Sequence, residues 1–213
     1  MPRAAKKKSA ARPKRAAPKK SFKARSTPTR KKKSVGAQPK VAGRRVRYAV
    51  AMSLDGYIAG PKGEYDWIIM DPDIDFGDIF SEFDTLLMGR KTFDLMKSQG
   101  DGTYPGMKTV VVSTTLKQSD YPTVTIVSDG IASFVKELKA QPGKDIWLFG
   151  GGELFRTLLD AGVVDGVGAA IMPVVIGGGV PFLPAPAKLT KLKLAKHKLY
   201  PKSGIMNVEY DVT

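Results

Sequence analysis

The sequence predicts an α/β fold with a mostly parallel central sheet, flanking helices and a closing antiparallel pair at the C-terminus. Strand-like and helix-like segments alternate from residue 85 to residue 161, which is typical of a parallel sheet. The stretch Asp145–Gly162 joins a short apolar strand, three glycines and an amphipathic helix. Leucines at 189, 192, 194 and 199 with intervening lysines, followed by the apolar residues of Ile205–Val212, predict the closing pair.

The glycine stretch predicts an anion site at a helix start. Gly150, Gly151 and Gly152 have no β-carbons, so a ligand can approach backbone N–H groups at the positive end of the following helix. Glu153 and Leu154 begin that helix, and Gly162 follows its end. A tight turn without a ligand is the alternative. The run GGGELF does not fit the Rossmann pattern G-x-G-x-x-G, because position 155 is Phe.

Charge divides the chain of 213 residues sharply. Residues 1–47 contain 19 of the 35 Lys and Arg residues and no Asp or Glu. We expect residues 1–43 to be a disordered Lys/Arg/Ala/Pro-rich tail and residues 44–213 to form one domain. Such a tail would contact nucleic-acid phosphates without sequence preference. A solubilising or targeting extension is the alternative.

Composition excludes several kinds of site. The chain has no Cys and one His, so disulfides and thiolate metal sites are excluded and we expect no metal. No apolar run approaches the roughly 18 to 20 residues of a membrane span, so we expect no membrane contact. We expect a cytoplasmic protein, with nucleoid association through the tail as an extension of that prediction.

The first part of the domain combines a strand with acidic residues. Arg44–Ser53 is a strand pattern that bends at Asp55–Gly56, and Tyr57–Ala59 is a second short apolar segment. Asp71–Phe83 is then predicted as a helix with core-facing Ile74, Ile79, Phe80 and Phe83. The carboxylates of Asp71, Asp73 and Asp75 suit the positive end of a helix.

Phosphate-compatible groups follow several predicted strands. The strand Thr85–Met88 ends in Gly89, Arg90, Lys91 and Thr92, and Thr109–Val112 ends in Ser113, Thr114 and Thr115. Because the carboxyl ends of parallel strands meet at one edge, we expect these segments beside Gly150–Leu154. A dinucleotide is the economical ligand for all three segments. Its pyrophosphate would use helix N-termini, and Arg90 and the hydroxyls would hold a further phosphate on the ribose.

The remaining segments predict structure more than chemistry. Val124–Val127 is a strand, and Ser128 or Asp129 is expected to cap the helix that follows it. Val163–Val175 is predicted as a strand. Ile176–Gly179 leads into prolines and not into a helix, so it lacks the dipole of a phosphate loop. His197 is interpreted as a surface or packing residue.

Several motifs together resemble a known family. In chain order these are VAMSLDGYIAG, DTLLMGRKTFDLM, KTVVVSTTL, DIWLFGGGELFRTLLDAG and MPVVIGGGVPFLP. They are similar to the dihydrofolate-reductase-like superfamily, and most similar to the reductase domain of riboflavin biosynthesis, over about residues 44–213.

The resemblance implies an NADPH-dependent reductase on a mostly parallel eight-stranded sheet. Its cofactor residues would be Ala51 and Ile58 beside the nicotinamide; Gly89, Arg90, Lys91, Thr92, Ser113 and Thr114 at the phosphates; and Gly150, Gly151, Gly152, Glu153 and Leu154 around the pyrophosphate. Some dihydrofolate reductases carry a basic residue where this chain has Glu153.

For the substrate, the resemblance implies a carboxylate. Asp55 matches the riboflavin-type reductases and is the first choice for substrate or proton handling, and Asp73 is the second. The expected substrate is a small pyrimidine- or pterin-like heterocycle, such as the phosphoribosylamino-pyrimidine of riboflavin synthesis. Relatives commonly pair through the closing strands, so a homodimer is expected. We expect no zinc-dependent deaminase half like that of the bifunctional enzymes, because such a domain needs His and Cys ligands and the sequence has no Cys. A cofactor-binding protein without turnover and a DNA-associated protein are the alternatives.

Overall fold

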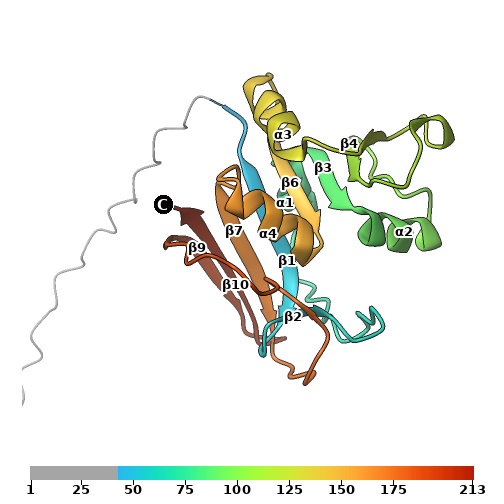
Figure 1. Cartoon of the computed structure of the whole chain (residues 1–213). Coiled ribbons are helices and arrows are strands. Elements are labelled where there is room, and N and C mark those ends of the chain that lie inside the picture. The colour runs from blue at the N-terminus through green and yellow to red at the C-terminus, as the bar shows by residue number, and fades with distance from the viewer. Residues whose placement is uncertain (1–42) are drawn as a thin grey trace, which may run out of the picture. The chain divides into compact units, whose positions relative to one another are not determined.

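The computed structural model describes residues 43–213, which fold around an eight-stranded sheet (Figure 1). The strands are β1 (Val46–Ser53), β2 (Tyr57–Ala59), β3 (Phe83–Gly89), β4 (Lys108–Val112), β5 (Thr125–Val127), β6 (Asp145–Gly150), β7 (Gly166–Met172), β8 (Val180–Pro181), β9 (Leu192–Tyr200) and β10 (Ile205–Val212). The helices are α1 (Phe76–Ser81), α2 (Arg90–Gln99), α3 (Ile131–Ala140), α4 (Gly152–Asp160) and the 3-10 turn η1 (Gln118–Asp120). The predictions of disorder and nucleic-acid contact for the tail lie outside the described residues.

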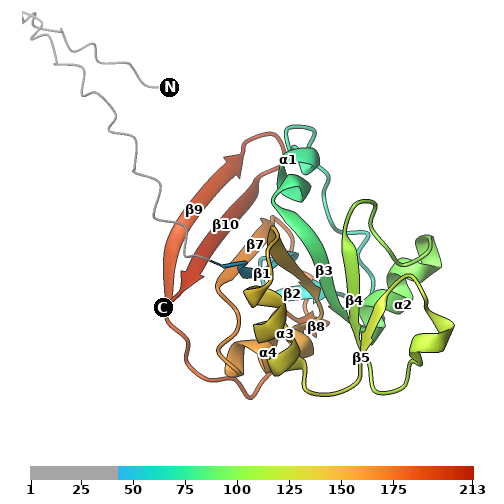
Figure 2. The same ribbon diagram turned by 90° about the horizontal axis from the view of Figure 1, so that it is seen from above.

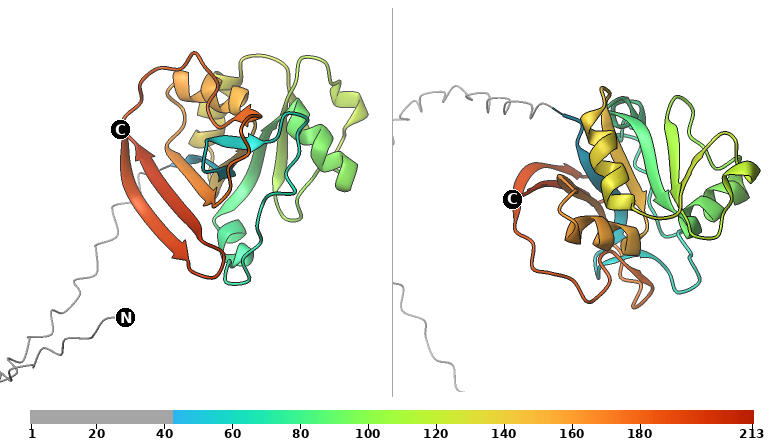
Figure 3. Two further views of the ribbon diagram at one scale, coloured as in Figure 1. Left: turned by 90° about the horizontal axis from the view of Figure 1, so that it is seen from below. Right: turned by 45° about the horizontal axis from the view of Figure 1, so that its top comes forward.

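The sheet is parallel except at one margin. Its strand order is β5-β4-β3-β6-β1-β7-β10-β9. The first six strands in this order pair in parallel, whereas β10 is antiparallel to both β7 and β9. This arrangement confirms the predicted mostly parallel sheet with a closing antiparallel pair. The short strands β2 and β8 form a separate pair, and the left view of Figure 3 shows them beside the edge where the parallel strands end.

Helices cover the two faces of the sheet. α3 and α4 lie on one face, and α1 and α2 lie on the other (Figure 2). Tyr48 of β1 is fully buried and stacks on Phe155 of α4 with ring centroids 3.9 Å apart. On the opposite face Phe93 of α2 is also fully buried, in a cluster with Leu86 and Met88. The parallel strands are therefore apolar on both sides, as a doubly covered sheet requires.

The helix predicted over Asp71–Phe83 is wrong in its extent. α1 contains only Phe76–Ser81, and Phe83 begins β3. Asp75 is the N-cap, and its side chain accepts from the N–H of Asp78 at 3.0 Å. The chain at residues 71–74 instead forms a turn, because the Asp71 carboxylate accepts from the N–H of Asp73 at 2.8 Å.

Three other boundaries differ from the prediction. Neither Ser128 nor Asp129 caps α3, because the N-cap is Gly130 in the left-handed conformation (φ 61°). β7 spans only Gly166–Met172, since Pro173 cannot donate to a ladder. Leu189 lies before β9 and is 95% exposed.

The arginines at 44, 45 and 47 belong to the folded domain, although the charge count groups them with the tail. The Arg44 side chain is buried; it donates from Nε to the carbonyl of Lys144 at 2.6 Å and pairs with Asp84. Arg45 pairs with Asp211 of β10. These contacts fix the start of β1 at the amino edge of the sheet. Within the described part of the chain, no helix is long and apolar enough to cross a membrane.

Replacing Leu148 by Ala should lower the free energy of unfolding by about 2 to 5 kcal/mol, because it empties space in the middle of β6, where the side chain is fully buried. Urea denaturation monitored by tryptophan fluorescence measures this change. The matched control is Leu189→Ala, which removes the same atoms from an exposed position and should change stability by less than about 0.5 kcal/mol. Equal losses in the two variants would contradict the assigned core.

Candidate functional site

The loops after β3 and β6 lie side by side at the carboxyl edge of the sheet. Met88 of β3 pairs with Gly150 of β6. A β-carbon added at Gly89 would lie 3.9 Å from the carbonyl oxygen of Gly150 and from the nitrogen of Gly151. One added at Gly150 would lie 3.4 Å from the Thr92 hydroxyl. The backbone of Gly89, Gly150 and Gly151 and the hydroxyl of Thr92 therefore form a surface between the starts of α2 and α4, which we call the glycine floor.

Arg90 connects this floor to the loop after β4. Its Nη1 donates to the hydroxyl of Thr115, and its Nε donates to the Asp94 carboxylate at 3.0 Å. Ser113 is buried, and its hydroxyl accepts from the N–H groups of Thr115 at 3.2 Å and Leu116 at 3.1 Å. The three predicted segments thus meet at one edge. Sequence reasoning noted the run of hydroxyls but did not assign a role to Thr115, and it missed Asp94.

The N-termini of α2 and α4 carry no side-chain caps. Their N-cap residues are Gly89 and Gly151, and neither helix has a capping hydrogen bond from a side chain. Gly150 has a φ of +142°, and the peptide bond between Gly150 and Gly151 is cis. Because no side chain caps either helix, the first-turn N–H groups of α2 and α4 are left without a side-chain acceptor and can bind an anion.

The remaining glycine-loop residues have separate roles. A β-carbon at Gly152 would lie 2.6 Å from the carbonyl oxygen of Pro181, so close packing of the 181–184 segment requires glycine there. Glu153 is exposed and forms an ion pair with Arg156 at 2.8 Å. The Leu154 side chain is buried in the core, so only its backbone can face a ligand. Lys91 is exposed and Thr92 is half-buried.

Asp55 joins the turn after β1 to the loop after β7. Its carboxylate oxygens accept from the N–H of Gly177 at 2.7 Å and of Ile176 at 3.3 Å. The pKa of Asp55 is lowered, first by the Ser53 hydroxyl and then by these two N–H groups. A side chain at Gly179 would collide with the carbonyl of Ala59. The glycines at 177–179 therefore serve the packing of β8 on β2. This structural role agrees with the prediction that they do not form a phosphate loop, because no helix follows them.

Ala51 and Ile58 lie near the same turn. Ala51 is half-buried in β1, pairs with Ala170 of β7 and contributes to a cluster with Trp67 and Ile68. Ile58 is half-buried in β2. Both residues are close to the carboxyl end of β1, next to the Asp55 turn.

Asp73 is held by the hairpin turn between β9 and β10. The Lys202 ammonium lies 2.9 Å from its carboxylate, and this hydrogen bond is the main cause of the raised pKa of Lys202. Neighbouring Asp71 is buried, and its pKa is lowered, chiefly by the Ser203 hydroxyl. The two predicted carboxylates are therefore anchored differently: Asp55 by the loop after β7, and Asp73 by the hairpin.

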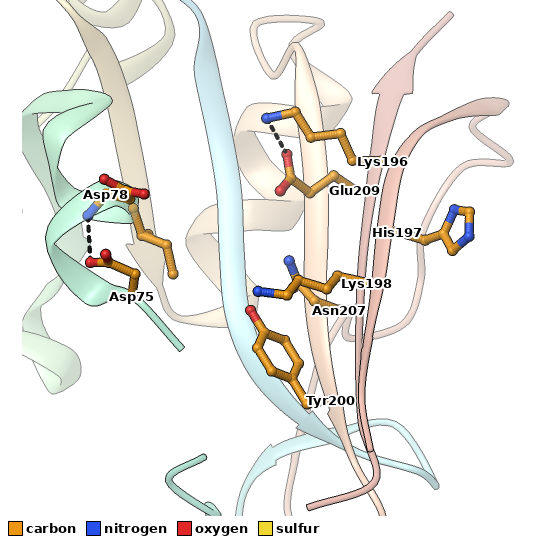
Figure 4. A pocket seen from close by; sticks show the side chains of 9 residues that line it. Asp75, Asp78, Lys196, His197, Lys198, Tyr200, Asn207 and Glu209 are labelled. Carbon is orange, nitrogen blue, oxygen red and sulfur yellow. Dashed lines mark hydrogen bonds and ion pairs between the residues drawn. The ribbon is translucent and has the colours of Figure 1, made fainter. Parts of the chain in front are cut away.

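A separate hollow of about 450 Å³ lies between α1 and the β9–β10 hairpin (Figure 4). Lys198, whose ammonium lies 4.4 Å from the centre of the Tyr200 ring, and Asn207 line the hairpin side, and Asp75 and Asp78 line the helix side. The exposed imidazole of His197 points away from these side chains in Figure 4, as expected for a surface residue. Within residues 43–213, no group of three His, Cys, Asp or Glu side chains is placed to hold a metal.

Comparisons with known proteins agree with this fold. The family model described as "RibD C-terminal domain" matches residues 44–205. The uncharacterized protein YyaP of Bacillus subtilis is 37% identical over 179 residues, which are 78% of this chain and 94% of YyaP. A putative riboflavin biosynthesis protein from Shewanella sp. PV-4 has a TM-score of 0.68 and 25% identity, covering 79% of this chain and 99% of its own. Dihydrofolate reductase from Enterococcus faecalis, complexed with NADP(H), has a TM-score of 0.57 and 17% identity, covering 79% and 94%.

Replacing Asp55 by Asn should destabilise the protein in a pH-dependent way. Since the folded-state pKa is lowered, the charged carboxylate stabilises the fold above its unfolded pKa of about 3.9, and this contribution is lost as pH falls through the folded pKa. Urea denaturation should therefore show a wild-type advantage at pH 7 that shrinks below about pH 4. The control Asp129→Asn, in an exposed turn, should match the wild type at pH 7. A pH-independent difference for Asp55→Asn would contradict the role of the charge.

Proposed function

Because this chain belongs to the family of the RibD C-terminal domain, we propose that it is an NADPH-dependent reductase of a small pyrimidine- or pterin-like heterocycle. One observation carries the proposal. Arg90 hydrogen-bonds to Thr115 beside the glycine floor, so a guanidinium, hydroxyls and two helix starts without side-chain caps lie together at one edge of the sheet. This set of groups suits a ligand with a pyrophosphate and one further phosphate.

The residues present fit the phosphates of such a cofactor. The N–H groups at the starts of α2 and α4 would bind the pyrophosphate over Gly89, Gly150 and Gly151, where no side chain other than Thr92 approaches the floor. Arg90 would bind the 2′-phosphate, with Ser113 and Thr114 nearby, and Lys91 would add positive charge. Glu153 opposes the pyrophosphate less than a free carboxylate would, because Arg156 pairs with it. The dihydrofolate reductase of the same fold was solved with NADP(H).

The chemistry follows from the groups near the end of β1. When bound, the dihydronicotinamide supplies hydride to an electrophilic carbon of the substrate. Ala51 and Ile58 would flank this ring. Asp55 is exposed and has a lowered pKa, so it is ionised at neutral pH and suits the role of acceptor for substrate N–H groups better than that of proton donor. Water would then supply the proton. Asp73 remains the second choice as substrate carboxylate.

Two functions of other classes remain as alternatives. A protein that binds the cofactor without turnover would bind its phosphates at the carboxyl edge of the sheet but would not transfer hydride. The tail carries basic residues and no acidic ones, so it would contact nucleic acid through phosphates, with affinity that falls as salt rises. This second activity would be independent of the reductase site. We propose a cytoplasmic setting for both.

Replacing Arg90 by Ala should weaken NADPH binding by roughly tenfold to over a hundredfold and leave NADH binding nearly unchanged. A charged hydrogen bond is worth about 1.5 to 3 kcal/mol, and only NADPH has the 2′-phosphate. Calorimetric titration of both nucleotides measures the difference. Arg45→Ala, which removes an arginine paired with an aspartate at the amino edge, is the matched control. Equal losses for the two nucleotides would remove Arg90 from this role.

Replacing Asp55 by Asn should reduce turnover of an aminopyrimidine substrate by roughly tenfold to a hundredfold and leave NADPH affinity intact, because a hydrogen bond to a charged group is worth about 1.5 to 3 kcal/mol. Asp73→Asn should cost only a few-fold, because Lys202 already occupies that carboxylate. Steady-state oxidation of NADPH at 340 nm reports turnover. Dihydrofolate should be a poor substrate. Efficient dihydrofolate reduction that survives Asp55→Asn and is lost in Asp73→Asn would reverse both assignments.

The hairpin of β9 and β10 supports a homodimer. Residues directly opposite each other in a ladder face the same side, and the pairs Leu199–Met206, Leu194–Tyr210 and Leu192–Val212 place apolar side chains on one face. Leu192, Leu194, Leu199 and Met206 are 43%, 50%, 55% and 44% exposed. An apolar sheet face of this kind is suited to a second copy of the chain.

Sedimentation of the full-length protein at tens of micromolar should therefore give a dimer, and Leu199→Glu should give a monomer, because it buries a charge in the interface. Leu189→Glu, at an exposed position outside β9, should leave the dimer intact. A monomeric wild type, or a Leu199→Glu variant that still dimerises, would reject this interface.

A further inference from the structure

The start of α2 has an unusual distribution of charge. Arg90 and Lys91 are its first two residues, and the first turn contains no acid. Helix N-termini favour negative side chains, so two cations there are locally unfavourable. The N-cap Gly89 contributes no side chain that could offset them. This end of the helix is therefore strongly positive and suited to an anion.

One carboxylate opposes this positive end. Asp94, one turn into α2, accepts from Nε of Arg90 at 3.0 Å, and the two side chains are 48% and 45% exposed. Thr115 accepts from the other side of the guanidinium. Thr115 is neutral, whereas Asp94 brings a negative charge to the same group. Any phosphate that binds Arg90 must therefore approach Asp94 as well.

The pair does not have the features of a purely structural helix pair. The favourable order places the acid four residues before the base, and here the base comes first. An exposed pair of this kind adds little to stability. Its larger effect is on the ligand that Arg90 binds, because it fixes the direction of the guanidinium and reduces the net charge around it.

We propose that Asp94 sets the preference between phosphorylated and unphosphorylated adenosine riboses at this edge. The proposal rests on the proposed cofactor function and adds a residue to it. Asp94 holds Arg90 against Thr115 and repels the 2′-phosphate of NADPH, whereas it does not repel the uncharged ribose hydroxyl of NADH. The wild-type chain therefore discriminates between the two nucleotides less strictly than Arg90 alone would permit.

The test uses the full-length protein and the variant Asp94→Asn, which removes the charge and keeps an oxygen that accepts from Arg90. Calorimetric titrations with NADPH, NADH, 2′,5′-ADP and 5′-ADP at fixed ionic strength separate the 2′-phosphate from the rest of the cofactor. NADPH and 2′,5′-ADP should bind about three- to tenfold more tightly to the variant, as expected for screened charges near a protein surface. NADH and 5′-ADP should change by less than about twofold. The control Asp160→Asn, at the exposed end of α4, should change none of the four.

The possible outcomes distinguish the role of Asp94 from the proposed cofactor function. Wild-type binding of NADPH with unchanged or weaker binding to Asp94→Asn would overturn the role of Asp94 and leave the cofactor function standing. An equal gain for NADH and NADPH would also overturn it, because the charge would then act on the shared pyrophosphate. If the wild type binds neither nucleotide, the proposed function fails and the role of Asp94 fails with it.

Discussion

The parallel pairing of β3 with β6 is the constraint on which the site depends. In this register Met88 lies beside Gly150, so the chain leaves both strands at the same height. The starts of α2 and α4 are therefore neighbours, and glycine at 89, 150 and 151 lets their backbones approach. The positive ends of two helix dipoles therefore lie close together. A single strand–loop–helix unit supplies only one such end for an anion.

Local patterns were sufficient to predict most of this edge. Glycine after an apolar run marks where a strand ends, and parallel order follows from strand–helix alternation, so Gly89–Thr92 and Gly150–Gly152 could be placed together from the sequence. The contact of Arg90 with Thr115 could not, because it depends on how far one side chain reaches over a neighbouring strand. Gly152 is a similar case, since its requirement for glycine comes from Pro181.

The misplaced helix start has the same origin. Asp71, Asp73 and Asp75 are equivalent as helix-start residues, and the sequence alone does not rank them. The tertiary structure does, because Asp71 is buried beside Ser203, Asp73 pairs with Lys202 and Asp75 alone caps α1. Those partners are about 130 residues away in the chain. Asp55 likewise meets Ile176 and Gly177 only after β7 has returned to β1.

The anchoring of residues 71–73 has a mechanical consequence. Lys202 and Ser203 lie in the turn between β9 and β10, and they hold the segment that leads into α1. Because β10 also pairs with β7, this turn is a fixed part of the eight-stranded sheet. The acidic turn is therefore attached to the antiparallel margin of the sheet, while α1, which follows it, leads into β3 on the other side of β1.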